Sequence, residues 1–263
     1  MELLELFSKI YLSELFNYFL AGSIGFGLFY VIFKKKWFYQ KIQLKDPKNK
    51  DFIREIRYSL FSMVFFTFTG ILIVHSPLTE YTKIYTDINA MPMWYYWLSF
   101  PIMAIMHDTY FYWMHRTLHH PALFKHTHLV HHKSTNPSPW AAYSFHPFEA
   151  ILEALIFPIM VLIIPLHLSA VASFFLFSIF YNVYGHLGYE LYPKGFNKHW
   201  LGRWINTSIH HNLHHKHFDN SYGLYFTFWD RVMGTMAPQY DDTFDEVKSR
   251  KTKLLEVEKS KVT

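Results

Sequence analysis

Long apolar stretches constrain the fold of this chain more than any other feature. A hydrocarbon core about 30 Å thick is crossed by roughly 20 helical residues. Apolar stretches near this length lie at 16–33, 58–74, 94–114 and 150–187. The last is interrupted by two prolines and a histidine, and fits either two full spans or a re-entrant hairpin. The sequence therefore predicts an all-α, polytopic membrane protein with about four transmembrane helices or hairpin segments.

Composition supports this prediction, because few charged residues are available for the polar face that a soluble helix of such length usually has. Hydrophobic residues make up 51% of the chain and charged residues 17%. The chain contains no cysteine, which excludes disulfides and iron–sulfur ligation. The start of the chain lacks a basic segment, so we expect no cleaved signal peptide. GSIGFG at 22–27 has no preceding strand and is better explained by close helix packing than by dinucleotide binding.

The distribution of basic residues predicts the topology. Nine lysines and arginines lie in the 34–57 loop, and the positive-inside rule places such a loop in the cytoplasm. The formal charge of +5 therefore indicates anionic lipid headgroups rather than nucleic acid as the partner. The N-terminus is then outside, and the segments that follow 94–114 and 150–187 return to the cytoplasmic face. We expect three parts: membrane helices and the basic loop (1–93), a catalytic domain (94–240), and a charged, partly disordered tail (241–263).

Histidine is concentrated in three clusters that follow these apolar stretches. Of 18 histidines, 14 lie within 107–132 or 199–217. Two clusters share the spacing i, i+3, i+4, which places three side chains within about a 100° arc of a helix. Neutral imidazole is the commonest metal ligand in proteins. The clusters therefore predict a multi-histidine metal site, and the topology brings all of them to one face of the membrane.

The number of histidines indicates two metal ions. The zinc-protease motif HExxH is absent from the sequence. Imidazole ligands suit Zn, Cu, Fe or Ni, and one four-coordinate zinc would need only four of the eight clustered histidines. Two redox metals beside a membrane suggest O₂ activation on a lipid chain.

The histidine-containing segments identify a family resemblance. From about Asp108 to Gly234 the chain contains DTYFYWMHRTLHHP, KHTHLVHHKS, FHPFE, YGHLGYE, HHNLHHKHF and SYGLYFTFWDRVMGT, in this order. These segments resemble the fatty acid hydroxylase/sterol desaturase superfamily of membrane di-iron oxygenases, and the last resembles its sterol desaturase branch. The resemblance implies two iron ions, O₂ as co-substrate, and hydroxylation or desaturation of a lipid. It also implies a separate electron donor of cytochrome b5, ferredoxin or flavoprotein type.

The resemblance also assigns metal ligands by position. The implied ligands are His115, His119, His120, His128, His131, His132, His186, His211, His214 and His215. His186 lies outside the three clusters. Some relatives carry a further histidine four residues after it, where this chain has Glu190.

Other residues near the clusters are expected to have supporting or structural roles. We expect His75, His107, His126, His167 and His199 to be structural, His146 to begin a helix or support a ligand, and His210 and His217 to support ligands. Asp108 either accepts a hydrogen bond from a ligand histidine or pairs with Arg116. Asp230 and Arg231 are expected to form a structural salt bridge.

Two other classes of protein remain to be distinguished from the enzyme. A histidine-rich metal transporter or metal store would place its ligands near the bilayer midplane, often with acidic partners. A membrane haem protein needs only a few histidines and would leave most of these unexplained. Neither fits ligands that lie at the ends of the apolar stretches.

Overall fold

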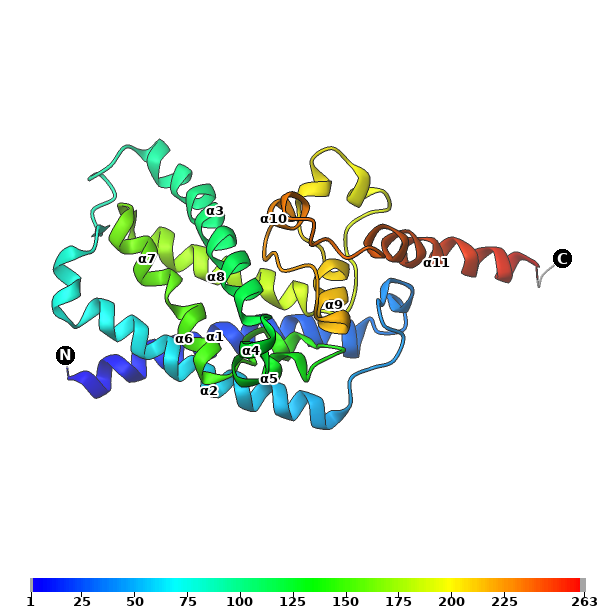
Figure 1. Cartoon of the computed structure of the whole chain (residues 1–263), viewed down its shortest axis with the longest axis horizontal. Coiled ribbons are helices and arrows are strands. Elements are labelled where there is room, and N and C mark those ends of the chain that lie inside the picture. Colours follow the sequence, from blue (N-terminus) through cyan, green and yellow to red (C-terminus); the bar gives the residue numbers. More distant parts are fainter. Residues whose placement is uncertain (1, 261–263) are drawn as a thin grey trace.

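The computed structural model describes residues 2–260, and this part of the chain is mostly helical, as predicted (Figure 1). The α-helices are α1 (Leu3–Phe26), α2 (Asn49–Val74), α3 (Met93–Leu118), α4 (Pro121–Thr127), α5 (Leu129–His132), α6 (Pro147–Ala154), α7 (Ile156–Ile163), α8 (Leu168–Gly185), α9 (Ser208–His217), α10 (Phe228–Val232) and α11 (Tyr240–Ser260). The two short strands are β1 (Ile84–Tyr85) and β2 (Leu166–His167).

Three helices of the described chain are long and apolar enough to cross a membrane. They are Leu3–Ile32, Asn49–Val74 and Leu168–Gly185. The first is longer than the predicted stretch, because α1 already begins at Leu3, and it continues as one π-helical segment, Gly27–Ile32. The helix α3 contains the predicted stretch 94–114 and matches α2 in length with 26 residues, but it is not among the three.

The region predicted as two spans or a hairpin forms two unequal arms. The first arm is divided at Leu155 into α6 and α7, each of eight residues. A helix of this length is about 12 Å long, so neither piece crosses a bilayer alone. The second arm is the single helix α8, of 18 residues.

A small parallel sheet fixes the arrangement of α3 and α8. The strand β1 pairs with β2, with Ile84 opposite Leu166 and Tyr85 opposite His167. This pairing ties the loop before α3 to the start of α8. The two helices begin at one end of the bundle and finish near α4, α5 and α9 at the other (Figure 1). Their last residues, and those that follow, are therefore brought together.

Small residues let α1 pack closely against its neighbours, as the GSIGFG segment predicted. A Cβ atom on Gly22 would lie 2.6 Å from Cζ3 of Trp140, and one on Gly25 would lie 3.1 Å from Cγ1 of Val183. These distances are shorter than ordinary carbon contacts. Alanine at Gly22 would therefore force the Trp140 ring to move.

The prediction of a partly disordered tail from 241 is wrong for the residues that the structure describes. These residues form α11, and Tyr240, Phe244 and Val247 are buried against Ile42 and Leu213. Their spacing of four and three residues is helical and gives α11 one apolar face. The many charges around these three residues obscured this pattern.

Candidate metal centre

Nine histidines form two groups at the end of the bundle where α3 and α8 finish. The five-histidine group consists of His115, His119, His128, His132 and His214. The four-histidine group consists of His131, His186, His211 and His215. Within each group, one ligand nitrogen from every histidine lies within 4.8 Å of the others. The structure thus brings together nine of the ten residues that the sequence predicted as ligands.

The helical spacing divides each HxxHH cluster between the two groups. His128 and His132, four residues apart, point into the five-histidine group, whereas His131 points into the four-histidine group. In α9 the division is reversed. His211 and His215 belong to the four-histidine group, and His214 belongs to the five-histidine group. Each of these helical segments therefore contributes to both groups.

The spacing of the Nε2 atoms fits metal coordination. In the five-histidine group, Nε2 of His128 lies 3.0 Å from that of His115 and 3.1 Å from that of His132. In the four-histidine group, Nε2 of His211 lies 3.0 Å from that of His186 and 3.1 Å from that of His215. Imidazoles that share one ion at about 2.1 Å have neighbouring nitrogens roughly 3 Å apart.

Hydrogen bonds at the other ring nitrogen fix the tautomer of several histidines. Nδ1 of His115 donates to the Tyr222 carbonyl (2.9 Å), and Nδ1 of His214 donates to the Asn220 carbonyl (2.7 Å). In the four-histidine group, Nδ1 of His186 donates to the carbonyl of Asn182 (2.8 Å). A neutral ring that donates from Nδ1 has a bare lone pair on Nε2.

The Glu149 carboxylate gives a fourth ring its orientation. Its Oε1 lies 2.6 Å from Nδ1 of His128, and both side chains are buried. Lone pairs that face one another in a buried site repel unless a cation lies between them. His214 Nε2 is buried without a protein partner, as expected of an atom that binds a metal. The residues present therefore fit two metal ions.

Burial also keeps these imidazoles neutral, which is the form that binds metal. Burial first, and then the neighbouring His115, lower the pKa of His119 to about 2, against a weaker opposing contact from the Phe218 backbone. Burial likewise lowers the pKa of His186 to about 4. The pKa of His211 and His215 is also well below the ordinary value, first through burial and then through the neighbouring histidines.

His120 is the one predicted ligand that the structure does not bring to either group. Its side chain is exposed, and Nδ1 accepts a hydrogen bond from the backbone N–H of Ala122 (3.3 Å) at the start of α4. The helix α3 ends at Leu118, and Pro121 begins α4. His120 lies in the turn between these helices, and its ring caps α4 instead of joining either group.

Glu190, which replaces a histidine found in some relatives, also lies outside both groups. Its carboxylate is fully buried and accepts hydrogen bonds from the Tyr184 hydroxyl and from the backbone N–H groups of Tyr192 and Ile209. Ile209 lies in the first turn of α9, where a carboxylate also interacts favourably with the helix dipole. Glu190 therefore fixes the position of α9.

The other histidines of the described chain lie outside the two groups, mostly as expected. His146 accepts a hydrogen bond from the Phe148 N–H and begins α6. His167 begins α8 in the same way. His126 and His217 are exposed, so the expected supporting role of His217 receives no support. His210 is buried next to Asp230.

Both aspartates singled out in the sequence bind backbone N–H groups. Asp108 accepts from Leu224, Tyr225 and Phe226, so neither proposed partner of Asp108, a ligand histidine or Arg116, is correct. Asp230 contacts His210 rather than Arg231, so the predicted salt bridge is wrong. Arg231 donates instead to the Arg203 carbonyl. Backbone N–H groups satisfy both buried carboxylates, together with His210 at Asp230.

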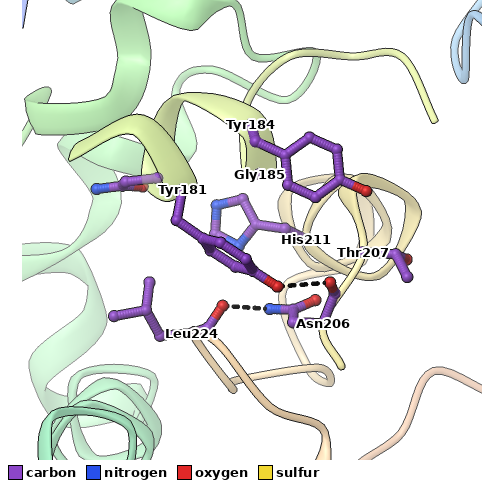
Figure 2. Close-up of a pocket in the computed structure, with 8 residues that line it drawn as sticks. Tyr181, Tyr184, Gly185, Asn206, Thr207, His211 and Leu224 are labelled. Carbon is purple, nitrogen blue, oxygen red and sulfur yellow. Dashed lines mark hydrogen bonds between the residues drawn. The ribbon is translucent and has the colours of Figure 1, made fainter. Parts of the chain in front are cut away.

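A small cavity reaches the four-histidine group from one side (Figure 2). Its lining includes His211, residues Tyr181 and Tyr184 at the end of α8, and Leu224. Asn206 links two sides of this lining. Its Nδ2 donates to the Leu224 carbonyl (2.9 Å), and its backbone carbonyl accepts from the Tyr181 hydroxyl (2.8 Å). The five-histidine group contributes no residue to this lining.

The fold and this centre define a helical protein with three candidate membrane spans and nine histidines in two groups that could hold metal ions. The fatty acid hydroxylase family model matches residues 100–235, which include all nine histidines. The chain belongs to the fatty acid hydroxylase/sterol desaturase superfamily.

Curated relatives point to the same superfamily over most of the chain. A probable Delta(7)-sterol 5(6)-desaturase of Neurospora crassa is 30% identical over 250 residues, which are 95% of this chain and 68% of the relative. Lathosterol oxidase of Rattus norvegicus is 33% identical over 201 residues, 75% of this chain and 66% of the relative. Lathosterol oxidase of Homo sapiens is 31% identical over 184 residues, 69% of this chain and 60% of the relative. No solved structure matches the chain significantly.

Proposed function

We propose that this protein is a membrane-bound, O₂-dependent di-iron oxidoreductase that hydroxylates or desaturates a lipid. The observation that carries the proposal is the pair of buried histidine groups with converging Nε2 atoms. Imidazole ligands suit redox-active iron. The matched relatives are sterol desaturases and lathosterol oxidases, so a sterol-like lipid is the first substrate to test.

The bound irons would supply O₂ activation and the oxidation of an unactivated C–H bond. Hydroxylation consumes one O₂, two electrons and two protons, inserts one oxygen atom into the C–H bond and releases one water. Desaturation consumes the same reagents, removes two hydrogen atoms from adjacent carbons and releases two waters. The electrons would come from a separate donor protein of cytochrome b5, ferredoxin or flavoprotein type.

The residues of the chain hold the metals, keep water away and position the lipid. The four histidines of the four-histidine group are buried, with at most 6% of each side chain exposed. The cavity beside His211 is the approach we propose for the reacting carbon, because it lies between the end of α8 and the ligand. A lipid in the membrane leaflet next to the metal centre would enter along α8, with Tyr181 and Leu224 moving aside.

The position of the groups favours an enzyme over a metal transporter. His115 lies in the last turn of α3, and His186 follows directly after α8. Transport ligands usually lie near the bilayer midplane. The basic loop lies at this same end, since Gln43 donates to Asn212 in α9 (3.0 Å). With the positive-inside rule, this contact supports a metal centre that faces the cytoplasm.

Lipid analysis with and without the active protein tests the function. The full chain is expressed in cells whose lipids are extracted and compared by mass spectrometry, with His211→Ala as the inactive control. The expected result is a lipid that gains one oxygen atom or loses two hydrogen atoms only with the unaltered protein. Identical lipid profiles, obtained with iron-loaded protein and a reducing partner present, would contradict the proposal.

A further inference from the structure

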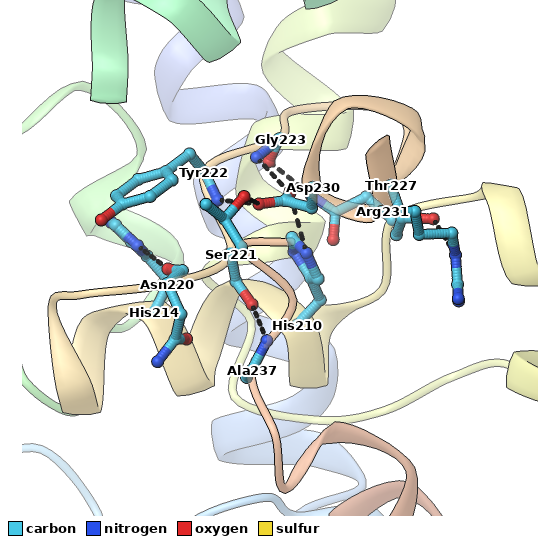
Figure 3. Close-up of polar contacts among 12 residues, drawn as sticks. His210, His214, Asn220, Ser221, Tyr222, Gly223, Thr227, Asp230, Arg231 and Ala237 are labelled. Carbon is cyan, nitrogen blue, oxygen red and sulfur yellow. Dashed lines mark hydrogen bonds and ion pairs between the residues drawn. The ribbon is translucent and has the colours of Figure 1, made fainter. Parts of the chain in front are cut away.

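The segment 218–223, which follows α9, is held in place by the buried Asp230 carboxylate (Figure 3). Oδ1 of Asp230 accepts from the Tyr222 N–H (2.9 Å) and from the Thr235 hydroxyl (2.7 Å). Oδ2 accepts from the Gly223 N–H (2.8 Å) and lies 3.1 Å from Nε2 of His210. Asp230 is fully buried, so these contacts replace all of its hydration.

The backbone of this segment needs such support, because it is locally strained. Phe218 and Ser221 have φ angles of 72° and 61°, in the left-handed region that side chains other than glycine rarely adopt. Gly223 is equally constrained, since a Cβ atom there would lie 2.3 Å from the Phe226 carbonyl oxygen. Strained backbone persists only where its surroundings hold it, and often marks a functional constraint.

The strained conformation directs two carbonyl groups at ligand histidines. The Asn220 carbonyl accepts from Nδ1 of His214, and the Tyr222 carbonyl accepts from Nδ1 of His115. The Tyr222 ring also packs against these two histidines and against His119, with ring centroids 5.1–5.7 Å apart. All three histidines belong to the five-histidine group.

The four-histidine group has supports that do not involve this segment. His186 donates to the carbonyl of Asn182, in its own helix. The start of α9, which carries His211 and His215, is fixed by the Thr207 hydroxyl and by Glu190, in addition to the contact between His210 and Asp230. Loss of Asp230 would therefore leave these ligands in place.

We propose that Asp230 is a positioning residue for the five-histidine group alone, and that it acts through the carbonyls of Asn220 and Tyr222. The inference rests on the proposed function in one respect, namely that each histidine group binds a metal ion. In this role Asp230 sets the tautomer and direction of His115 and His214 without touching metal or substrate. Partners of this outer kind typically change metal affinity by roughly 10–100-fold.

The test measures metal binding site by site in the full-length protein. Detergent-purified protein is stripped of metal and titrated with Co²⁺, whose absorption reports binding. In Asp230→Asn the amide nitrogen must replace either Oδ1, which accepts from Tyr222 and Thr235, or Oδ2, which accepts from Gly223 beside His210. It would face a backbone N–H in both cases, so the network cannot remain intact. The expected result is normal binding at one site and roughly 10–100-fold weaker binding at the other.

Double variants identify which site is affected. With His186→Ala, which disables the four-histidine group, Asp230→Asn should weaken the remaining site. With His115→Ala and His128→Ala together, which leave three histidines and disable the five-histidine group, Asp230→Asn should leave the remaining site unchanged. Two sites with unaltered affinity in Asp230→Asn would overturn the proposal, and so would equal weakening of both.

Two further variants separate positioning from general stability. Glu55→Gln alters another fully buried carboxylate, which bonds to the Ser138 hydroxyl, and should leave both affinities unchanged. If Asp230→Asn does not fold, Thr235→Val removes a single donor to Asp230 and should produce a smaller loss at the same site. Unchanged metal affinity at both sites in Thr235→Val, or equal weakening of both, would then overturn the inference. Normal Co²⁺ binding without lipid oxidation would contradict the proposed function but not this role.

Discussion

The two histidine groups differ in how their ligands are held. In the five-histidine group two ligands are held by partners distant in the sequence: His115 by Tyr222 and His128 by Glu149, which are 107 and 21 residues away. His214 is instead held by a near partner, Asn220, six residues after it. The four-histidine group depends on nearer ones. His186 is fixed by Asn182, four residues before it, and His131 by the Ser144 carbonyl, 13 residues after it.

This difference indicates that the two groups should lose metal binding through different kinds of substitution. The five-histidine group has one ligand to spare over a four-coordinate site but needs several loops to be correctly placed. The four-histidine group has no spare imidazole, yet its supports form as the helices form. Ligand substitutions should therefore affect the four-histidine group most, and changes in supporting residues should affect the five-histidine group most.

His186→Ala is expected to produce the largest effect. It leaves three histidines in the four-histidine group, so one metal ion should be lost and lipid oxidation should disappear. Elemental analysis of purified protein and a product assay measure both effects. His126→Ala is the control, because His126 is exposed and lies outside both groups. Wild-type activity and metal content in His186→Ala would remove this residue from the ligand set.

Glu149→Ala should have a smaller effect, directed at the other group. It removes the carboxylate that accepts from Nδ1 of His128, so His128 loses its orientation. We expect metal affinity to fall roughly 10–100-fold, as for other outer partners of ligand histidines. Metal titration and the product assay report the change. The prediction is wrong if the weakened site is the one that His186→Ala disables.

The pH dependence of stability should also differ between the unaltered protein and His186→Ala. In the metal-free chain, burial lowers its pKa from 6.5 to about 4. Its contribution to stability is complete above the unfolded pKa of about 6.5 and is lost as pH falls, because only the unfolded chain takes up the proton. His186→Ala should therefore reduce the pH slope of the unfolding free energy by about 1.4 kcal/mol per pH unit between pH 6.5 and 4. Denaturation of metal-free protein at several pH values measures this slope, and equal slopes in the two proteins would contradict the shift.

His120→Ala should have the smallest effect of the four. The change removes an acceptor for the Ala122 N–H at the start of α4, and loss of such a cap costs about 1 kcal/mol. Both metal ions and the activity should be retained, since the side chain is exposed and lies outside both groups. Loss of a metal ion from this variant would show that the five-histidine group extends to His120.

Much of the centre could be predicted from spacing alone. The i, i+3, i+4 pattern placed the imidazoles of α9 on one face, and the apolar stretches brought the clusters to one end of the bundle. Spacing did not reveal that each cluster is divided between two groups, because that depends on how α5 and α9 face each other. His120 was included because the resemblance matches it by position, although in the structure Pro121 begins a new helix directly after it.

The supporting residues could not be predicted, because their partners are distant or lie in irregular backbone. Asp108 binds a loop 116 residues away, and no local pattern indicates such a contact. The Asn220 and Tyr222 carbonyls carry no side-chain signal at all. Glu149 lies in the FHPFE segment, whose resemblance marked the segment without indicating which residue acts. The helix α11 was missed because its three buried residues stand among charges.

The division of each cluster also limits how this sequence can vary over evolutionary time. A single inserted or deleted residue within α9 would rotate everything after it by about 100°. His214 and His215 would then leave their different groups in the same event. An insertion or deletion in this helix therefore cannot change one metal position without changing the other. Insertions between Asp87 and Met93, at the opposite end of the bundle, would leave both positions intact.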